Sequence, residues 1–141
     1  MINEQYVAGI DAGTTGTTVM IADLQGSVVG TAYREYPCNY PHPGWVEQDM
    51  EHIWRKICAA SQEVLHKTGI DPKGVVSLGF SSQRGTFVCV DKTINPLADS
   101  IVWSCGRAGA ELAWLKEHLG AKRFHEISGV PLSGLWSYAK M

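Results

Sequence analysis

Asp11-Ala12-Gly13-Thr14-Thr15-Gly16-Thr17-Thr18 joins two short apolar segments near the start of this chain. The segment on its N-terminal side is Tyr6–Asp11, and the β-branched, apolar segment on its C-terminal side is Thr17–Asp23. Apolar runs around a short turn that contains glycine are typical of paired antiparallel strands. We therefore predict a β-hairpin whose connection holds the glycines and threonines.

The composition of this connection suits a phosphate group. Glycines let the backbone approach closely, consecutive N–H groups point at phosphate oxygens, and threonine hydroxyls add donors. A carboxylate repels phosphate, so Asp11 makes chemical sense as a ligand of Mg²⁺, reached through water. The alternative is an ordinary hairpin turn rich in glycine and threonine, with Asp11 as a turn residue. These eight residues alone leave both interpretations open.

The next part of the chain predicts one more strand and one long helix. Val28–Tyr36 predicts a third strand, and Pro37–Gln48 is expected to be a loop because proline cannot continue a strand ladder. Asp49 is a typical helix N-cap, and Gly69 followed by Pro72 marks a helix end. Between them, apolar residues recur at the spacing of one buried helix face: Met50, Ile53, Trp54, Ile57, Cys58, Val64 and Leu65.

The second half predicts further strands and helices. The continuous apolar run Val75–Ser81 is typical of a strand buried on both faces. Thr86–Asp91 and Ser100–Trp103 predict short strands, and helices are expected over residues 107–119 and 121–127. No linker or repeat interrupts the chain. We therefore expect one unit built on a mixed α/β sheet.

Composition excludes several classes of protein. The 141 residues suit one domain, 45% are hydrophobic, and 14 acidic against 12 basic side chains give a net charge of −2. That balance argues against binding to nucleic acid or a membrane surface, and no apolar run could span a bilayer. The start does not resemble a signal peptide, and the four cysteines and five histidines show no metal or disulfide spacing. We expect a globular, cytoplasmic protein.

Several segments resemble one known family. Asp11–Thr15 between two strands is similar to the first phosphate loop of the sugar-kinase, actin and heat-shock ATPase superfamily. The FGGY carbohydrate kinases, which include glycerol kinase and xylulokinase, are similar in further segments: Tyr40-Pro41-His42-Pro43-Gly44-Trp45-Val46-Glu47-Gln48-Asp49, Trp54, Ser82-Gln83-Arg84, Ile101-Val102-Trp103 and Arg107. The resemblance implies a ribonuclease H-like α/β fold, with an antiparallel meander at the start of a mixed sheet and helices packed on it.

The resemblance also implies an ATP-dependent kinase that phosphorylates a hydroxyl of a sugar or polyol. It assigns Asp11 to Mg²⁺ and Gly13, Thr14 and Thr15 to the phosphates of ATP, a set that suits phosphoryl transfer. The family's catalytic base lies beyond residue 141, so residues 1–141 correspond to an incomplete N-terminal domain without the C-terminal ATPase domain. We expect no catalytic residue in this chain and no kinase activity from it alone.

Substrate contacts are implied after the fourth predicted strand. The resemblance assigns Gln83 and Arg84 to substrate hydroxyls, for which an amide and a guanidinium offer donors and an acceptor. The alternative is an exposed pair in a loop. Trp103 is similar to the family tryptophan that packs on the carbon face of the substrate. Two helical tryptophans are expected in the core instead: Trp54 and Trp114.

The chain departs from the glycerol-kinase pattern in three places. Thr18 stands where glycerol kinases carry a basic residue, and Gly85 stands where they carry a glutamate. A tyrosine that contacts substrate in glycerol kinases corresponds to a position near Leu135 or Trp136. We therefore expect a substrate larger than glycerol that uses the space beside Gly85, although the sequence does not identify the sugar or polyol.

Two other functions were weighed against a kinase. A non-catalytic sugar- or partner-binding module with the same fold needs only the binding residues. A nuclease of the ribonuclease H type needs several carboxylates around two metal ions, and only Asp11 is suitably placed. If the facing half is absent, apolar surface is exposed, so self-association as a homo-oligomer is expected.

Overall fold

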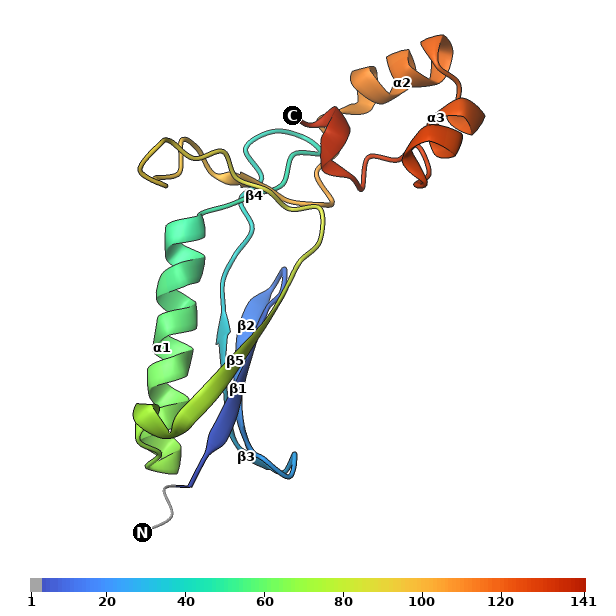
Figure 1. The fold of residues 1–141 in the computed structure, drawn as a ribbon. Coiled ribbons are helices and arrows are strands. Elements are labelled where there is room, and N and C mark those ends of the chain that lie inside the picture. Colours follow the sequence, from blue (N-terminus) through green and yellow to red (C-terminus); the bar gives the residue numbers. More distant parts are fainter. Residues whose placement is uncertain (1–3) are drawn as a thin grey trace. The chain divides into compact units, whose positions relative to one another are not determined.

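The computed structural model describes residues 4–141, which divide into two compact units (Figure 1). The first, named here the sheet unit, consists of the chain up to Pro37 together with Asp49–Gln83. The second, named the loop unit, consists of Cys38–Gln48 and Arg84–Met141. Each unit is built from stretches that are separated in the sequence. For that reason no single linker marks a boundary between them.

The sheet unit contains a four-stranded mixed sheet. Strands β1 (Tyr6–Ala12), β2 (Gly16–Asp23) and β3 (Val28–Glu35) form an antiparallel meander. Strand β5 (Val75–Ser82) pairs with β1 in parallel, which gives the order β3-β2-β1-β5. The structure thus confirms the predicted meander and mixed sheet, with strand ends within a residue or two of the expected ones.

Helix α1 (Met50–Thr68) packs along one face of this sheet, mainly on β2 and β3 (Figure 1). The Asp49 side chain caps its start by accepting a hydrogen bond from the His52 N–H. At its end, Gly69 has a φ of 68°, and its N–H donates to the Leu65 carbonyl. Apolar side chains of the helix and of the first three strands form the core: Ile10, Ala12, Val19, Ile21, Ala32, Tyr36, Ile53, Ile57, Ala60 and Val64.

The prediction that the β5 strand is buried on both faces is wrong for the described residues. Val76, Leu78 and Phe80 are 51%, 57% and 55% exposed. The reason is position, because β5 is an edge strand of the sheet and α1 lies over the opposite half. The apolar run correctly predicted a strand but could not predict whether a neighbour covers it.

The loop unit contains little regular sheet. Strands β4 (Glu47–Gln48) and β6 (Ser100–Ile101) pair antiparallel, and helices α2 (Gly109–His118) and α3 (Ala121–Ser128) follow. The strand predicted over Thr86–Asp91 does not form; only the bridges Phe87–Ile101 and Val90–Pro96 remain. Two short 3-10 turns complete the described elements: Pro72–Gly74 in the sheet unit and Ser137–Ala139 in the loop unit.

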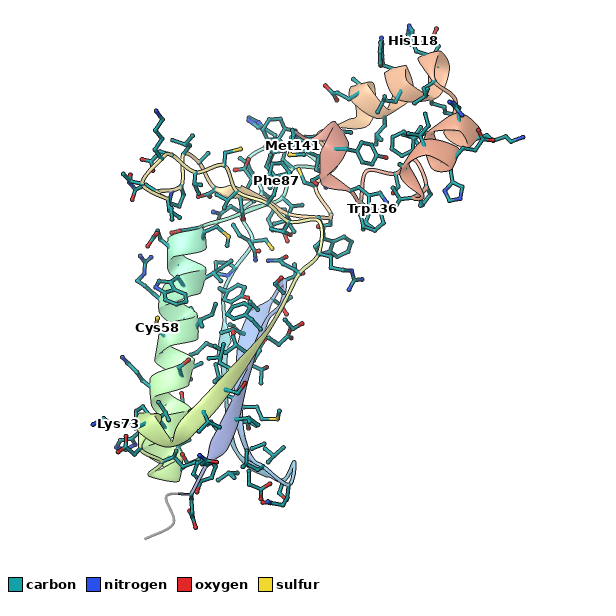
Figure 2. All side chains as sticks on the ribbon, in the orientation of Figure 1. Cys58, Lys73, Phe87, His118, Trp136 and Met141 are labelled. Atoms are coloured by element: carbon teal, nitrogen blue, oxygen red, sulfur yellow. The ribbon has the colours of Figure 1, made fainter. Side chains whose placement is uncertain are left out.

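The two helical tryptophans are not in the core, contrary to prediction. Trp54 is 58% exposed and Trp114 is 57% exposed. In the loop unit, Trp114 stacks on His118, with ring centroids 4.3 Å apart. Figure 2 shows His118 at the end of α2. Between residues 4 and 141, no helix combines the length and apolarity needed to cross a bilayer.

The cap at Asp49 leads to a stability prediction. Asp49→Ala removes the acceptor for the His52 N–H, so we expect the free energy of unfolding to fall by about 1 kcal/mol in urea denaturation. Asp49→Asn is the matched control, because asparagine caps a helix as well as aspartate. Equal losses in both variants would contradict the capping role.

A turn in the loop unit leads to a pH prediction. Asp91 accepts hydrogen bonds from the backbone N–H and the side-chain amide of Asn95 and from the hydroxyl and N–H of Thr93. These bonds, with that of the Asn95 N–H contributing most, lower the pKa of Asp91 from 3.8 to about 2. Because the pKa is lowered on folding, the stabilisation of the turn is complete above pH 3.8 and is lost as the pH falls through about 2. A carbon NMR titration of the Asp91 carboxyl should give that midpoint, and Asn95→Ala should raise it. A parent midpoint near 3.8 would contradict this account.

Candidate functional site

The alternation of side chains along β1 separates the core from the candidate site. Ile10 and Ala12 are buried against the α1 side of the sheet. Asp11, between them, therefore points to the opposite face, and it is exposed. Its register partners are Thr18 on β2 and Ser81 on β5, so two hydroxyl side chains flank the carboxylate on that face.

The connection between β1 and β2 is a tight turn beside this carboxylate. The Gly13 N–H donates to the Gly16 carbonyl at 3.0 Å and closes the turn. A Cβ at Gly13 would lie 3.2 Å from the Gly16 oxygen and 3.8 Å from Asp11 Oδ2. Thr14 is half-buried and Thr15 is exposed. The structure thus brings four predicted residues together: Asp11, Gly13, Thr14 and Thr15.

This group of residues fits a phosphate with a hydrated Mg²⁺. Backbone N–H groups and threonine hydroxyls are donors for phosphate oxygens, and glycine at position 13 keeps the approach open. One carboxylate is sufficient because Mg²⁺ usually keeps several waters and takes its remaining ligands from substrate phosphates. Residues 4–141 contain no group of three or more His, Cys, Asp or Glu side chains that could hold a metal by themselves.

Gln83 lies next to the same turn. Its N–H donates to the Ala12 carbonyl at 3.1 Å, which extends the pairing of β5 with β1 by one residue. The parallel pairing therefore places Gln83 at the same sheet edge as the β1–β2 turn. Arg84 is exposed and begins the stretch that belongs to the loop unit.

Trp103 is held in the loop unit by its backbone. Its N–H donates to the Thr86 hydroxyl at 3.1 Å, and its carbonyl accepts from Lys140 Nζ at 2.6 Å. Burial lowers the pKa of Lys140, which also donates to the Val102 carbonyl. The Trp103 side chain remains 36% exposed. The anchored backbone and partly open ring are compatible with the predicted contact to a substrate.

The expected open space beside Gly85 is already occupied. Gly85 has a φ of 76°, and a Cβ there would lie 2.7 Å from the Leu135 carbonyl oxygen and 3.4 Å from Trp103 Cβ. The space that a Cβ at position 85 would need is therefore not open to a substrate, while the expected substrate larger than glycerol stays a prediction. The backbone near the end of the chain takes the room that a side chain at position 85 would need.

A half-buried cation, Arg107, organises the loop that precedes α1. Arg107 pairs with Glu47 at 2.6 Å and lies over the Trp45 ring, 4.0 Å from its centroid. It also donates to Cys105 Sγ at 3.0 Å. Burial alone raises the pKa of Cys105, but hydrogen bonds from Arg107 and the Val46 backbone bring it below its usual value. Since each partner of Arg107 belongs to the loop unit, we assign this cluster to folding.

Sequence reasoning missed three residues, one in the sheet unit and two in the loop unit. Tyr36 was expected only as the end of a strand, yet its hydroxyl bonds to the β1–β2 turn. Lys140 was assigned no role. Trp136 was noted only as a changed position, but its indole N–H is buried without a partner among residues 4–141. The departure from the glycerol-kinase pattern near residue 135 was the available signal for Trp136.

The mixed sheet, with its antiparallel meander and its parallel strand β5, defines a ribonuclease H-like α/β fold. A family model described as "FGGY family of carbohydrate kinases, N-terminal domain" matches residues 6–141. The chain belongs to this family.

Individual relatives agree with the family. A glycerol kinase of Methylorubrum extorquens is 38% identical over 136 residues, which are 96% of this chain and 27% of the relative. A glycerol kinase of Synechocystis is 37% identical over 99% of this chain and 28% of its own length. The crystal structure of a xylulose kinase from Rhodospirillum rubrum superposes with a TM-score of 0.87 at 28% identity, covering 96% of this chain and 28% of that structure. The chain therefore spans little more than a quarter of these relatives, and the predicted sugar-kinase fold is confirmed.

The contact at Gly85 leads to a prediction for the loop unit. Gly85→Ala places a Cβ against the Leu135 carbonyl at a φ that disfavours side chains, so we expect a loss of about 1–3 kcal/mol in the free energy of unfolding. Gly109→Ala is the control, because its Cβ would meet nothing within 4 Å. A Gly85→Ala variant as stable as its parent would contradict the close approach of Leu135.

Proposed function

We propose that this chain is the N-terminal part of an ATP-dependent kinase that phosphorylates a hydroxyl of a sugar or polyol. The observation that carries the proposal is Asp11, exposed on the face of β1 opposite α1 and beside the glycine–threonine turn. In this role Gly13, Thr14 and Thr15 bind phosphate oxygens, and Asp11 holds Mg²⁺ through water. When bound, Mg²⁺ neutralises charge that develops on the transferred phosphoryl group.

The remaining site residues are proposed for the substrate. Gln83 and Arg84 bind its hydroxyls, and Trp103 packs against its carbon face. The names of the relatives, glycerol kinase and xylulose kinase, support an alcohol of the sugar or polyol class. The catalytic base is proposed to come from beyond residue 141, from the part of the kinase that this chain does not include. We also propose that the kinase acts in the cytoplasm. Self-association of the chain as a homo-oligomer stays a prediction.

We further propose that glycerol is not the preferred substrate. The glutamate that glycerol kinases carry is absent at Gly85, and the Leu135 carbonyl blocks the direction that its side chain would take. Thr18, a register partner of Asp11, brings a neutral hydroxyl where glycerol kinases have a cation. This change concerns the phosphate and not the choice of substrate: either another basic residue replaces the cation or the phosphate is held less tightly.

The test is a coupled assay of ADP release with the whole kinase that contains this chain. Pentuloses, hexuloses, polyols and glycerol are compared as substrates, and we expect the highest kcat/KM for a substrate other than glycerol. Asp11→Asn should lower kcat/KM at least about 100-fold, the size of effect seen when one stabilising group for developing charge is lost. Asp71→Asn, which alters a carboxylate that only caps a 3-10 turn, should leave kcat/KM within about twofold.

Each part of the proposal has its own contradicting result. No sugar-dependent ADP release from the whole protein would overturn the kinase and favour a non-catalytic binding module. Glycerol as the best substrate would overturn the account of Gly85. ADP release by residues 1–141 alone would contradict the placement of the catalytic base outside this chain.

A further inference from the structure

Tyr36, the residue after β3, makes an unusual set of contacts with the β1–β2 turn. Its hydroxyl lies 2.6 Å from the Gly13 carbonyl oxygen and 3.0 Å from the Gly16 carbonyl oxygen. Its backbone N–H donates to the Thr15 carbonyl at 3.2 Å. Tyr36 therefore donates hydrogen bonds to three carbonyl oxygens within residues 13–16 of the turn. The whole arrangement lies within the sheet unit.

The burial of Tyr36 shows which way the carbonyl groups bound by its hydroxyl point. The side chain is 5% exposed and belongs to the hydrophobic core, so the carbonyls that it binds turn toward the protein interior. A trans peptide is planar, with its N–H opposite its C=O. The hydroxyl holds the Gly13 carbonyl inward, and this turns the Thr14 N–H, in the same peptide, outward. The bond from the Tyr36 N–H to the Thr15 carbonyl continues the β3–β2 pairing and fixes the end of the turn against β3.

Packing of the ring alone does not explain why residue 36 is a tyrosine with a hydroxyl group. A phenylalanine would fill the same volume, and a buried hydroxyl is costly unless it is hydrogen-bonded. Both acceptors of this hydroxyl are backbone atoms of the turn, 20 and 23 residues earlier in the sequence. Another tyrosine, Tyr33 of β3, also lies close to this turn, because a Cβ at Gly16 would overlap its ring and hydroxyl.

We propose that Tyr36 is the positioning residue of the phosphate loop, residues 13–16, an inference that rests on the proposed kinase function. Carbonyl oxygens facing ATP would repel its phosphates, whereas N–H groups facing ATP attract them. Tyr36 holds the carbonyls inward before ATP binds. The loop is thereby preorganised for phosphate and pays little reorganisation when the nucleotide arrives.

The test is Tyr36→Phe in the whole kinase, with initial rates measured against ATP and against the best sugar or polyol. We expect the KM for MgATP to rise about fivefold, the factor that corresponds to one hydrogen bond of typical net strength. The KM for the sugar should stay within about twofold, because the loop does not touch it. Tyr6→Phe is the matched control: it removes a hydroxyl whose 2.6 Å hydrogen bond goes to Glu4, outside the loop.

A second measurement separates the inference from the proposed function. Amide hydrogen exchange of residues 13–16 is compared in Tyr36→Phe and its parent, and we expect at least about tenfold faster exchange in the variant with the rest of the sheet unchanged. Unchanged exchange and an unchanged KM for MgATP would overturn the role of Tyr36. A parent without kinase activity would overturn the proposed function, while the exchange rates would still decide whether Tyr36 positions the loop.

Discussion

The alternation of side chains along β1 is the constraint on which the rest of the structure depends. Ile10 and Ala12 face α1 and join the core, and this fixes Asp11 on the other face, at the point where the strand turns. A shift of one residue in register would bury the carboxylate and expose the core residues. The fold and the proposed chemistry are therefore set by the same pattern.

Strand pairing places further polar residues at the sheet edge that holds Asp11 and the β1–β2 turn. The parallel pairing of β5 with β1 brings Ser81 beside Asp11 and Gln83 beside Ala12. Strand β3 ends beside the start of β2, so Tyr36, the next residue, lies against the β1–β2 turn and its hydroxyl donates to the Gly13 carbonyl. The loop unit separately holds Trp103, Gly85 and the backbone of Leu135 together. The chain covers about a quarter of the length of its relatives. Its proposed share of the kinase is the set of binding groups, and the proposed base lies outside it.

Local signals predicted the parts of the fold that depend on local physics. The cap at Asp49, the stop at Gly69 and the helical spacing between them gave α1 its bounds, and the glycine–threonine turn located β1 and β2. Features that depend on distant neighbours were not predictable in this way. Helical spacing predicted Trp54 in the core, but the residue is 58% exposed. The close approach of the Leu135 carbonyl to Gly85 joins residues 50 positions apart in the sequence. Tyr36 was missed for the same reason.

The most direct test of the central claim is hydrogen exchange of the whole kinase with and without MgATP. The account predicts that amides of residues 13–16 become protected when MgATP binds, and that Asp11→Asn weakens this protection because the metal is held less well. Protection confined to other parts of the protein, with residues 13–16 unchanged at saturating MgATP, would contradict the claim that this turn binds phosphate.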